Sequence, residues 1–139
     1  MANNFSEKAS FVCDFTDKSM TVYIRGEIDH HSAVAIRNGI DALLFENRPQ
    51  KLRLDLSGVN FMDSSGLGLI MGRLSVMKAL GGHLMLLNPS HETQNILSLA
   101  GMERLVPIAY TKEQTPEQPP RKPTRRTSRR RPSKVDPPA

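Results

Sequence analysis

The chain has 139 residues, a length that suits one compact domain with or without an extension. Its formal net charge is +5, yet residues 1–110 carry 10 basic and 11 acidic side chains while residues 111–139 carry 9 and 3. No apolar run approaches the ~18 residues of a membrane-spanning helix, and the N-terminus lacks the pattern of a secretory leader. The single cysteine, Cys13, excludes an internal disulfide and a thiolate zinc site, so we expect a reducing, cytoplasmic location.

The first half of the chain predicts two strands, a helix and a third strand. Residues 10–16 and 20–26 have the composition of two strands joined by a short polar turn. From Ser32, apolar residues recur at helical spacing until Asn47, shortly before Pro49. Residues 51–56 then alternate strictly between polar and apolar, which predicts a strand with one buried face.

The second half predicts two more helices, each followed by a strand. A helix is expected from Ser64 to Gly81-Gly82 and is followed by a strand at 83–88. A second helix is expected from Ser90 to Gly101 and is followed by a strand at 105–108. The apolar stripe predicted for the helix from Ser64 is Leu67, Ile70, Met71, Leu74 and Met77. The order ββαβαβαβ requires right-handed crossovers between parallel strands. We therefore predict an α/β (α+β) fold with helices packed on a mixed sheet.

Composition changes sharply after Tyr110. Seven of the ten prolines lie beyond it, interleaved with Arg, Lys, Ser and Thr, and Val135 is the only large aliphatic residue there. Such a segment cannot bury enough apolar surface to offset its ordering entropy. We expect a folded domain over residues 1–110 and a disordered basic, Pro/Arg-rich tail over residues 111–139. The tail is either a solvated extension or a segment that makes weak, salt-sensitive contacts with nucleic acid or anionic lipid.

The most unusual segment, residues 60–68, lies where a strand is expected to pass into a helix. Asp63 is placed to cap the helix, with Ser64 and Ser65 in its first turn, where backbone N–H groups lack intrahelical acceptors. Gly66 and Gly68 follow, although Ala at either position would favour the helix by about 1 kcal/mol. Close approach of another backbone would explain these glycines. The helix start suits an oxyanion, including a phosphate on one of its own serines, although simple capping explains the pattern equally well.

Enzymatic and metal chemistry find no support in the residues. Met62 occupies the position two before Ser64, where a nucleophile elbow needs glycine, and no glycine-rich phosphate loop or acid/base constellation occurs. Adjacent His30 and His31 point in different directions and have no nearby Cys ligands, so they indicate a polar turn before a helix capped by Ser32. Asp29 is expected to be an acceptor in that turn. We predict no catalytic residue, no metal and no cofactor. Cys13 and the methionines Met71, Met77 and Met85 are interpreted as core residues.

Two segments carry a family resemblance: Phe61-Met62-Asp63-Ser64-Ser65-Gly66-Leu67-Gly68 and Gly26-Glu27-Ile28-Asp29-His30-His31-Ser32-Ala33. Together they resemble the anti-sigma-factor antagonists, single STAS domains of Gram-positive bacteria. Within that family they are most similar to the sporulation branch, which antagonises the sigma-F anti-sigma kinase. Gly81-Gly82 and Ser98-Leu99-Ala100-Gly101-Met102 also fit. The resemblance spans roughly residues 9–110 and leaves the tail without a counterpart.

The resemblance implies a partner-switching mechanism. The unphosphorylated antagonist binds an anti-sigma factor that is also a serine kinase and thereby frees a sigma factor. The kinase phosphorylates the serine that matches Ser64, and a PP2C-type phosphatase reverses this. The partner surface implied by the family motif comprises Asp29, His30, Ser32, Asp63, Ser65, Gly66, Leu67 and Gly68. Two alternatives stay open: another STAS regulator, in the stress response or a signalling assembly, or nucleic-acid binding through the tail.

Overall fold

Five strands and three α-helices alternate along residues 8–111, the part of the chain that the computed structural model describes. In chain order they are β1 (Ala9–Thr16), β2 (Ser19–Ile28), α1 (His30–Asn47), β3 (Lys51–Met62), α2 (Ser64–Ala79), β4 (His83–Leu87), α3 (His91–Leu99), a 3-10 helix (Met102–Arg104) and β5 (Ile108–Ala109). This order confirms the predicted ββαβαβαβ arrangement and the mixed α/β class.

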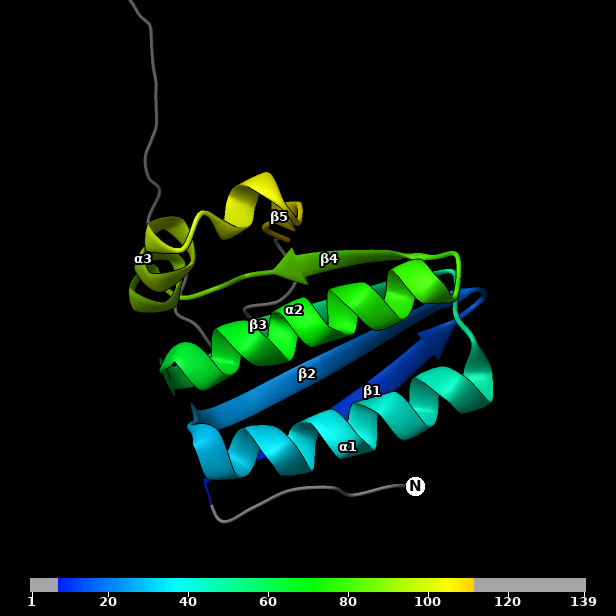
Figure 1. Ribbon diagram of the computed structural model, residues 1–139, viewed down its shortest axis with the longest axis horizontal. Helices are drawn as coiled ribbons and strands as arrows, with labels where there is room; N and C mark the ends of the chain where they lie inside the picture. The colour runs from blue at the N-terminus through cyan, green and yellow to red at the C-terminus, as the bar shows by residue number, and fades with distance from the viewer. Residues whose placement is uncertain (1–7, 112–139) are drawn as a thin grey trace, which may run out of the picture.

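The strands form one sheet in the order β1-β2-β3-β4-β5 (Figure 1). β1 and β2 are antiparallel and meet in a tight turn, where Asp17 adopts a positive φ of 53°. β2, β3, β4 and β5 are mutually parallel, so each connection between them crosses over the sheet. As a result α1, α2 and α3 all begin at the carboxyl ends of parallel strands.

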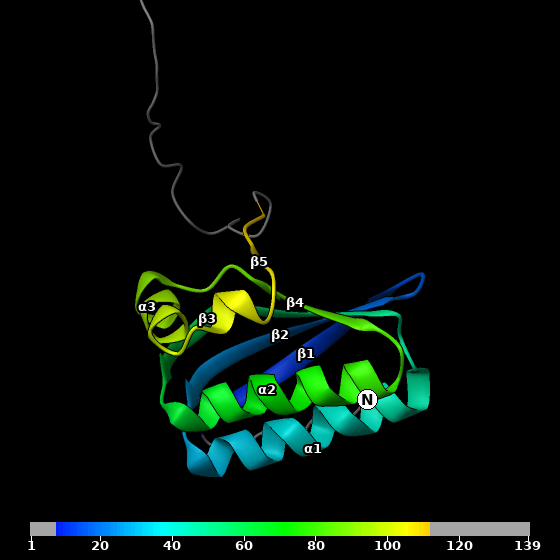
Figure 2. The ribbon, with the colours of Figure 1, turned by 45° about the horizontal axis from the view of Figure 1, so that its top comes forward.

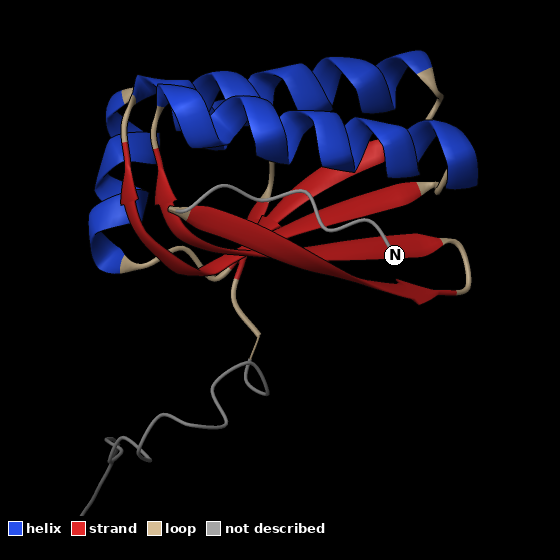
Figure 3. Ribbon diagram, turned by 90° about the horizontal axis from the view of Figure 1, so that it is seen from below, coloured by secondary structure: helices blue, strands red, loops and turns tan. Residues whose placement is uncertain are grey.

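The helices α1 and α2 lie side by side across one face of the sheet, and no described helix covers the opposite face (Figure 3). α3 lies close to the beginning of α2, at the edge of the sheet where α1 also starts (Figures 1 and 2). The carboxyl ends of the parallel strands and the starts of the helices therefore lie together at one end of the sheet, which forms one edge of the molecule. We call it the switch edge and define it by Asp29, Asp63 and Ser64.

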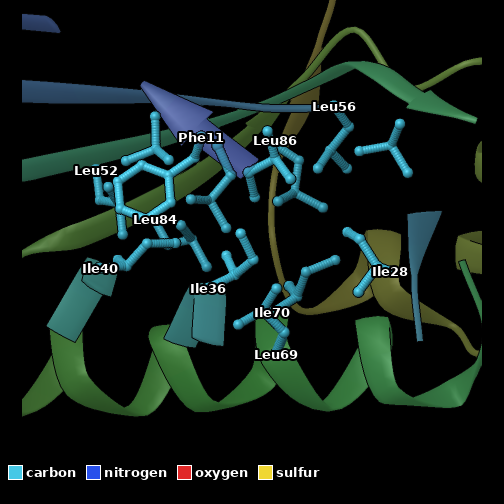
Figure 4. Close-up of a cluster of buried hydrophobic side chains, with 14 of the residues drawn as sticks. Phe11, Ile28, Ile36, Ile40, Leu52, Leu56, Leu69, Ile70, Leu84 and Leu86 are labelled. Atoms are coloured by element: carbon cyan, nitrogen blue, oxygen red, sulfur yellow. The ribbon is translucent and has the colours of Figure 1, made fainter. Parts of the chain in front are cut away.

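The core fills the layer between the sheet and α1 and α2 (Figure 4). The alternating residues Leu52, Leu54 and Leu56 of β3 are at most 1 % exposed, as the period of two predicts. Across from them, Ile36 and Ile40 of α1 are fully buried. Because each such side chain contributes about 1.5–3 kcal/mol when removed from water, this layer holds both helix starts in place.

Several boundaries differ from the sequence prediction, among them those of α1, β3 and the last strand. α1 begins two residues earlier than Ser32, because Asp29 rather than Ser32 is its N-cap. β3 runs on to Met62, since two irregularities in its pairing with β2 let the longer strand follow its neighbour. The last strand is Ile108–Ala109 and not residues 105–108, because the 3-10 helix Met102–Arg104 takes up the chain just before it.

The buried stripe of α2 also differs from the prediction. It consists of Gly66, Leu69, Ile70, Arg73 and Met77. The expected core residue Met71 is instead 38 % exposed, so its assignment to the core was wrong. The period of the apolar pattern could not show this, because a buried arginine occupies one of the inward positions. That arginine pairs with Asp41 of α1.

The described chain ends at Thr111, which the sequence boundary placed in the tail. Its backbone N–H donates to Oδ1 of Asn88 at 2.8 Å, and Asn88 in turn donates to the buried Asp55 at 3.0 Å. The remainder of the expected tail, residues 112–139, lies outside the described residues, as do residues 1–7. Among the helices of residues 8–111, none is long and apolar enough to cross a membrane.

Candidate functional site

The starts of α1 and α2 are neighbours because β2 and β3 are neighbouring parallel strands. The register pairs Ile28 with Met62, the last residues of the two strands. Just beyond them, the backbone N–H of Asp63 donates to the carbonyl of Ile28 at 3.3 Å. The two motifs that carry the family resemblance are thus brought together at the switch edge, although 34 positions separate Asp29 from Asp63.

Asp63 caps α2 as predicted. Its Oδ1 accepts from the backbone N–H of Ser65 at 2.8 Å, and its carbonyl accepts from Gly66 N–H at 2.9 Å. Ser64 is the first helical residue and is exposed, whereas Ser65 is half-buried. The more accessible of the two serine side chains is therefore Ser64, at a helix start that favours negative charge.

Asp29 and Ser32 form a reciprocal capping box at the start of α1. The Asp29 carboxylate accepts from Ser32 N–H at 2.8 Å, and Ser32 Oγ accepts from Asp29 N–H at 2.9 Å. The Ser32 hydroxyl also donates to the carbonyl of Glu27 at 2.8 Å. The predicted cap at Ser32 is thus corrected: Ser32 is fully buried and positions Asp29, so it presents no side chain to a partner.

A cation balances the charge of this capping box. Nζ of Lys8 lies 3.0 Å from Oδ2 of Asp29 in an ion pair whose side chains are 57 % and 23 % exposed. The hydrogen bond from Ser32 N–H and the ammonium of Lys8 hold the pKa of Asp29 well below its usual range. No local pattern reveals this partner, since Lys8 and Asp29 are separated by the whole β1–β2 hairpin.

The lowered pKa of Asp29 predicts how acid acts on the fold. A carboxyl with a depressed folded-state pKa stabilises above its unfolded pKa of about 3.9, and that contribution disappears as pH falls through the folded-state value. Asp29→Asn keeps a good N-cap but loses the charge. We expect its Tm to lie below that of the wild type at pH 6, with the difference shrinking below about pH 4. Thermal unfolding followed by circular dichroism checks this, and a difference independent of pH would contradict it.

Gly66 and Gly68 have different reasons to be glycine. A Cβ on Gly66 would lie 2.0 Å from Cγ and 2.5 Å from Sδ of Met62, itself 2 % exposed. The close neighbour is a side chain and not the backbone that the sequence suggested. A Cβ on Gly68 would have no atom within 4 Å among the described residues. Packing within the described chain therefore explains the first glycine and not the second.

This difference gives a matched pair of variants. Gly66→Ala gains helix propensity but forces Met62 out of a buried position, so we expect a net loss of about 1–2 kcal/mol. Gly68→Ala meets no obstacle, so we expect a gain of up to about 1 kcal/mol. Urea unfolding of both variants tests the pair. Equal effects on the free energy of unfolding would mean that Met62 does not constrain Gly66.

The other residues predicted to contact a partner differ in how exposed they are on the switch edge. His30 is exposed at the first position of α1, and Leu67 is half-buried on the flank of α2. Phe61, two positions before Asp63, is 50 % exposed and was not singled out from the sequence as a partner residue. Its place at the end of a strand extended by pairing irregularities could not be predicted from periodicity.

Within the described part of the chain, the remaining histidine, cysteine and acidic side chains form no metal-binding cluster. Among residues 8–111, no group of three or more His, Cys, Asp or Glu side chains is arranged to hold a metal ion. Burial raises the pKa of the Cys13 thiol to about 11, so this cysteine is protonated at neutral pH and unreactive as a nucleophile. What the switch edge offers is an exposed serine, Ser64, at one capped helix start with a second capped helix start beside it.

Known proteins share this arrangement of sequence and fold. The family model described as STAS domain matches residues 10–115. An anti-sigma F factor antagonist of Lysinibacillus sphaericus is 36% identical over 87 residues, which are 63% of this chain and 74% of that protein. An anti-sigma-B factor antagonist of Bacillus subtilis (strain 168) is 32% identical over 97 residues, 70% of this chain and 87% of that protein.

Solved structures agree with these relatives. The anti-sigma factor antagonist SpoIIAA in its unphosphorylated form superposes with a TM-score of 0.65 at 28% identity, covering 75% of this chain and 90% of that one. The Bacillus cell fate determinant SpoIIAA in its phosphorylated form superposes with a TM-score of 0.60, also at 28% identity. This match covers 75% of this chain and 93% of that one. The shared fold thus includes a protein whose structure is known in both phosphorylation states.

Proposed function

Because this chain belongs to the STAS domain family, we propose that it is an anti-sigma factor antagonist controlled by phosphorylation of Ser64. Its unphosphorylated form binds an anti-sigma factor that is also a serine kinase, and this binding releases the sigma factor. The relatives named as anti-sigma F factor antagonists support the sporulation branch. We expect the protein to act in the cytoplasm as a regulator without enzymatic activity.

The observation that carries the proposal is the position of Ser64. It is the exposed first residue of α2, directly after the N-cap Asp63 and beside the start of α1 at Asp29. A phosphate at this position adds about −1.5 to −2 charges where backbone N–H groups accommodate it, so the fold survives. A partner seated over the edge must instead desolvate that charge next to two carboxylates. Phosphorylation therefore changes affinity without refolding the domain.

The decisive experiment mixes the purified full chain with the anti-sigma kinase of the same organism and ATP, then locates the phosphate by mass spectrometry. We expect one phosphate on Ser64, none on the Ser64→Ala variant, and an unchanged site in the Ser65→Ala variant. A PP2C-type phosphatase should remove it. A chain that stays unmodified, or that carries the phosphate on Ser65, would overturn the assignment.

Gly68 supplies a second test of the partner surface. Since no described atom approaches it, its small size is explained if a partner packs closely against α2 one turn after Ser64. Gly68→Ala should then bind the anti-sigma factor at least tenfold more weakly while unfolding at higher urea than the wild type. Isothermal titration calorimetry measures the affinity. Unchanged binding would remove Gly68 from the surface.

A stress-response role is the second candidate, supported by the similarity to the anti-sigma-B factor antagonist. Both candidates share the mechanism and differ in the partner. Co-purification of the chain with the sporulation and the stress-response anti-sigma factors of its organism distinguishes them. Nucleic-acid binding through the tail concerns residues outside the described range. It predicts salt-dependent retention on DNA or RNA that is lost on deleting residues 112–139.

A further inference from the structure

Three chain segments meet in a row along the switch edge. The antiparallel register places Ala9, the first residue of β1, opposite Gly26, and the parallel register places Ile28 opposite Met62. The segment entering β1, the start of α1 and the start of α2 therefore follow one another across neighbouring strands. Lys8 belongs to the first of these, Asp29 to the second and Ser64 to the third.

The backbone of Lys8 is fixed at this place by a close approach to β2. Its carbonyl accepts from the N–H of Glu27 at 2.8 Å. Gly26, directly before Glu27, has a φ of +102°, and a Cβ there would lie 2.0 Å from the Lys8 carbonyl oxygen. Only glycine permits both the conformation and the approach. Gly26, which opens the family motif over residues 26–33, thus serves to hold Lys8 beside the start of α1.

The side chain of Lys8 then reaches the capping box. Its ammonium pairs with Oδ2 of Asp29, while Oδ1 accepts from Ser32 N–H. The elements that meet at this edge carry three further carboxylates and three histidines. The carboxylates are Glu27 of β2, Asp63 before α2 and Glu92 of α3, and the histidines are His30 and His31 of α1 and His91 of α3.

We propose that Lys8 is a charge-balancing and positioning residue of the switch, which stabilises the dianionic form of a phosphate on Ser64. The inference rests on the proposed function only in taking Ser64 as the modified residue. Carboxylates close to a phosphate disfavour its second ionisation, whereas a nearby ammonium favours it. By neutralising Asp29, Lys8 lowers the electrostatic cost of the second negative charge. The N-terminal entry to the domain thereby contributes to the switch.

The test needs no kinase. Phosphoserine is incorporated at position 64 during translation, and its second pKa is followed by ³¹P NMR between pH 4.5 and 8. The pKa is compared in the wild type, Lys8→Met and Lys78→Met. Lys78 lies 14 positions along α2, about 21 Å from Ser64, and so serves as a matched control. We expect Lys8→Met to raise the phosphoserine pKa by about 0.2–0.5 at low salt, and Lys78→Met to leave it unchanged.

Two further measurements separate charge balance from a merely structural pair. The shift should shrink at 0.5 M salt, and it should persist when the wild type and Lys8→Met both also carry His30→Gln and His31→Gln. A phosphoserine pKa equal in Lys8→Met and Lys78→Met would overturn the proposal, even if the pKa of Asp29 rises. Such a failure leaves the anti-sigma assignment standing, because that assignment depends on the kinase reaction measured separately.

Discussion

Ser64→Asp should weaken binding to the anti-sigma factor by about 2–3 kcal/mol, roughly 30- to 150-fold, while the domain stays folded. A fixed carboxylate at the first position of α2 adds to the negative charge of Asp29 and Asp63, and a partner covering the edge must desolvate all three. The same charge interacts favourably with the helix N-terminus, so the Tm should change by only a few degrees. True phosphorylation, with a larger charge, should cost about 3–4 kcal/mol.

Ser75→Asp is the matched control for this variant. Ser75 is exposed on the same helix, about 16 Å along its axis from Ser64, so an added charge there lies away from the edge. Titration calorimetry with the purified anti-sigma factor should show wild-type affinity for Ser75→Asp. If Ser64→Asp bound as tightly as the wild type, or if both variants lost affinity equally, the charge-based switch would be wrong.

Asp41→Ala should destabilise the domain by about 2–3 kcal/mol, because it leaves the buried guanidinium of Arg73 without a counter-charge. Nε of Arg73 lies 2.8 Å from Oδ1 of Asp41 without hydrogen-bond alignment, and Nη2 donates to Oδ2 at 3.2 Å. Arg73 is only 4 % exposed, whereas the Asp41 side chain is 26 % exposed. Burial lowers the pKa of Arg73 and Asp41 opposes this.

The asymmetry of the pair predicts a contrast between its two halves. Arg73→Met replaces the buried charge with an apolar chain of similar length. Although Oδ1 of Asp41 is buried, its side chain is 26 % exposed, so the variant should cost less than Asp41→Ala, about 1 kcal/mol. Glu46→Gln, an exposed change on α1, should have no effect and controls for surface charge. Urea unfolding at pH 7 ranks the three variants. A larger loss for Arg73→Met than for Asp41→Ala would refute this account of the pair.

The Asp41–Arg73 ion pair also affects the switch edge, because it joins α1 to α2 farther along both helices than their first residues. A change in how the helices pack would move Asp29 relative to Ser64. We therefore expect Asp41→Ala to weaken partner binding even at temperatures where it is folded. The stability of the pair and the geometry of the switch edge are thus linked through two helices of one layer.

Much of the local structure was predictable from single segments. Strict alternation in residues 51–56 predicted the buried face of β3, and Asp63 was identified as the cap of α2 because its carboxylate can reach the first free N–H groups. The same local chemistry placed Ser64 and Ser65 in the first turn of α2, and the family resemblance singled out Ser64 as the serine to test. These features depend on a few adjacent residues, so periodicity and capping preferences suffice to predict them.

Other features depended on backbone conformation or on residues far apart in the chain. The cap of α1 was misassigned to Ser32 because either residue of a capping box can serve as the acceptor, and the distinction lies in backbone conformation. The exposure of Met71 was missed because Arg73 is buried by a partner on another helix. Local hydropathy cannot reveal a buried arginine, since its burial is compensated by a charge 32 positions away.

The sequence by itself determined the order of elements, the near-neutral charge of residues 1–110 and the serine at a helix start, since each is encoded in composition or short-range pattern. Tertiary structure alone decided that Lys8, Asp29 and Ser64 share one edge and that Gly66 is required by Met62 while Gly68 faces open space. The physical reason is strand register. Pairing between β1, β2 and β3 converts separations of many residues into neighbouring positions, which no local pattern records.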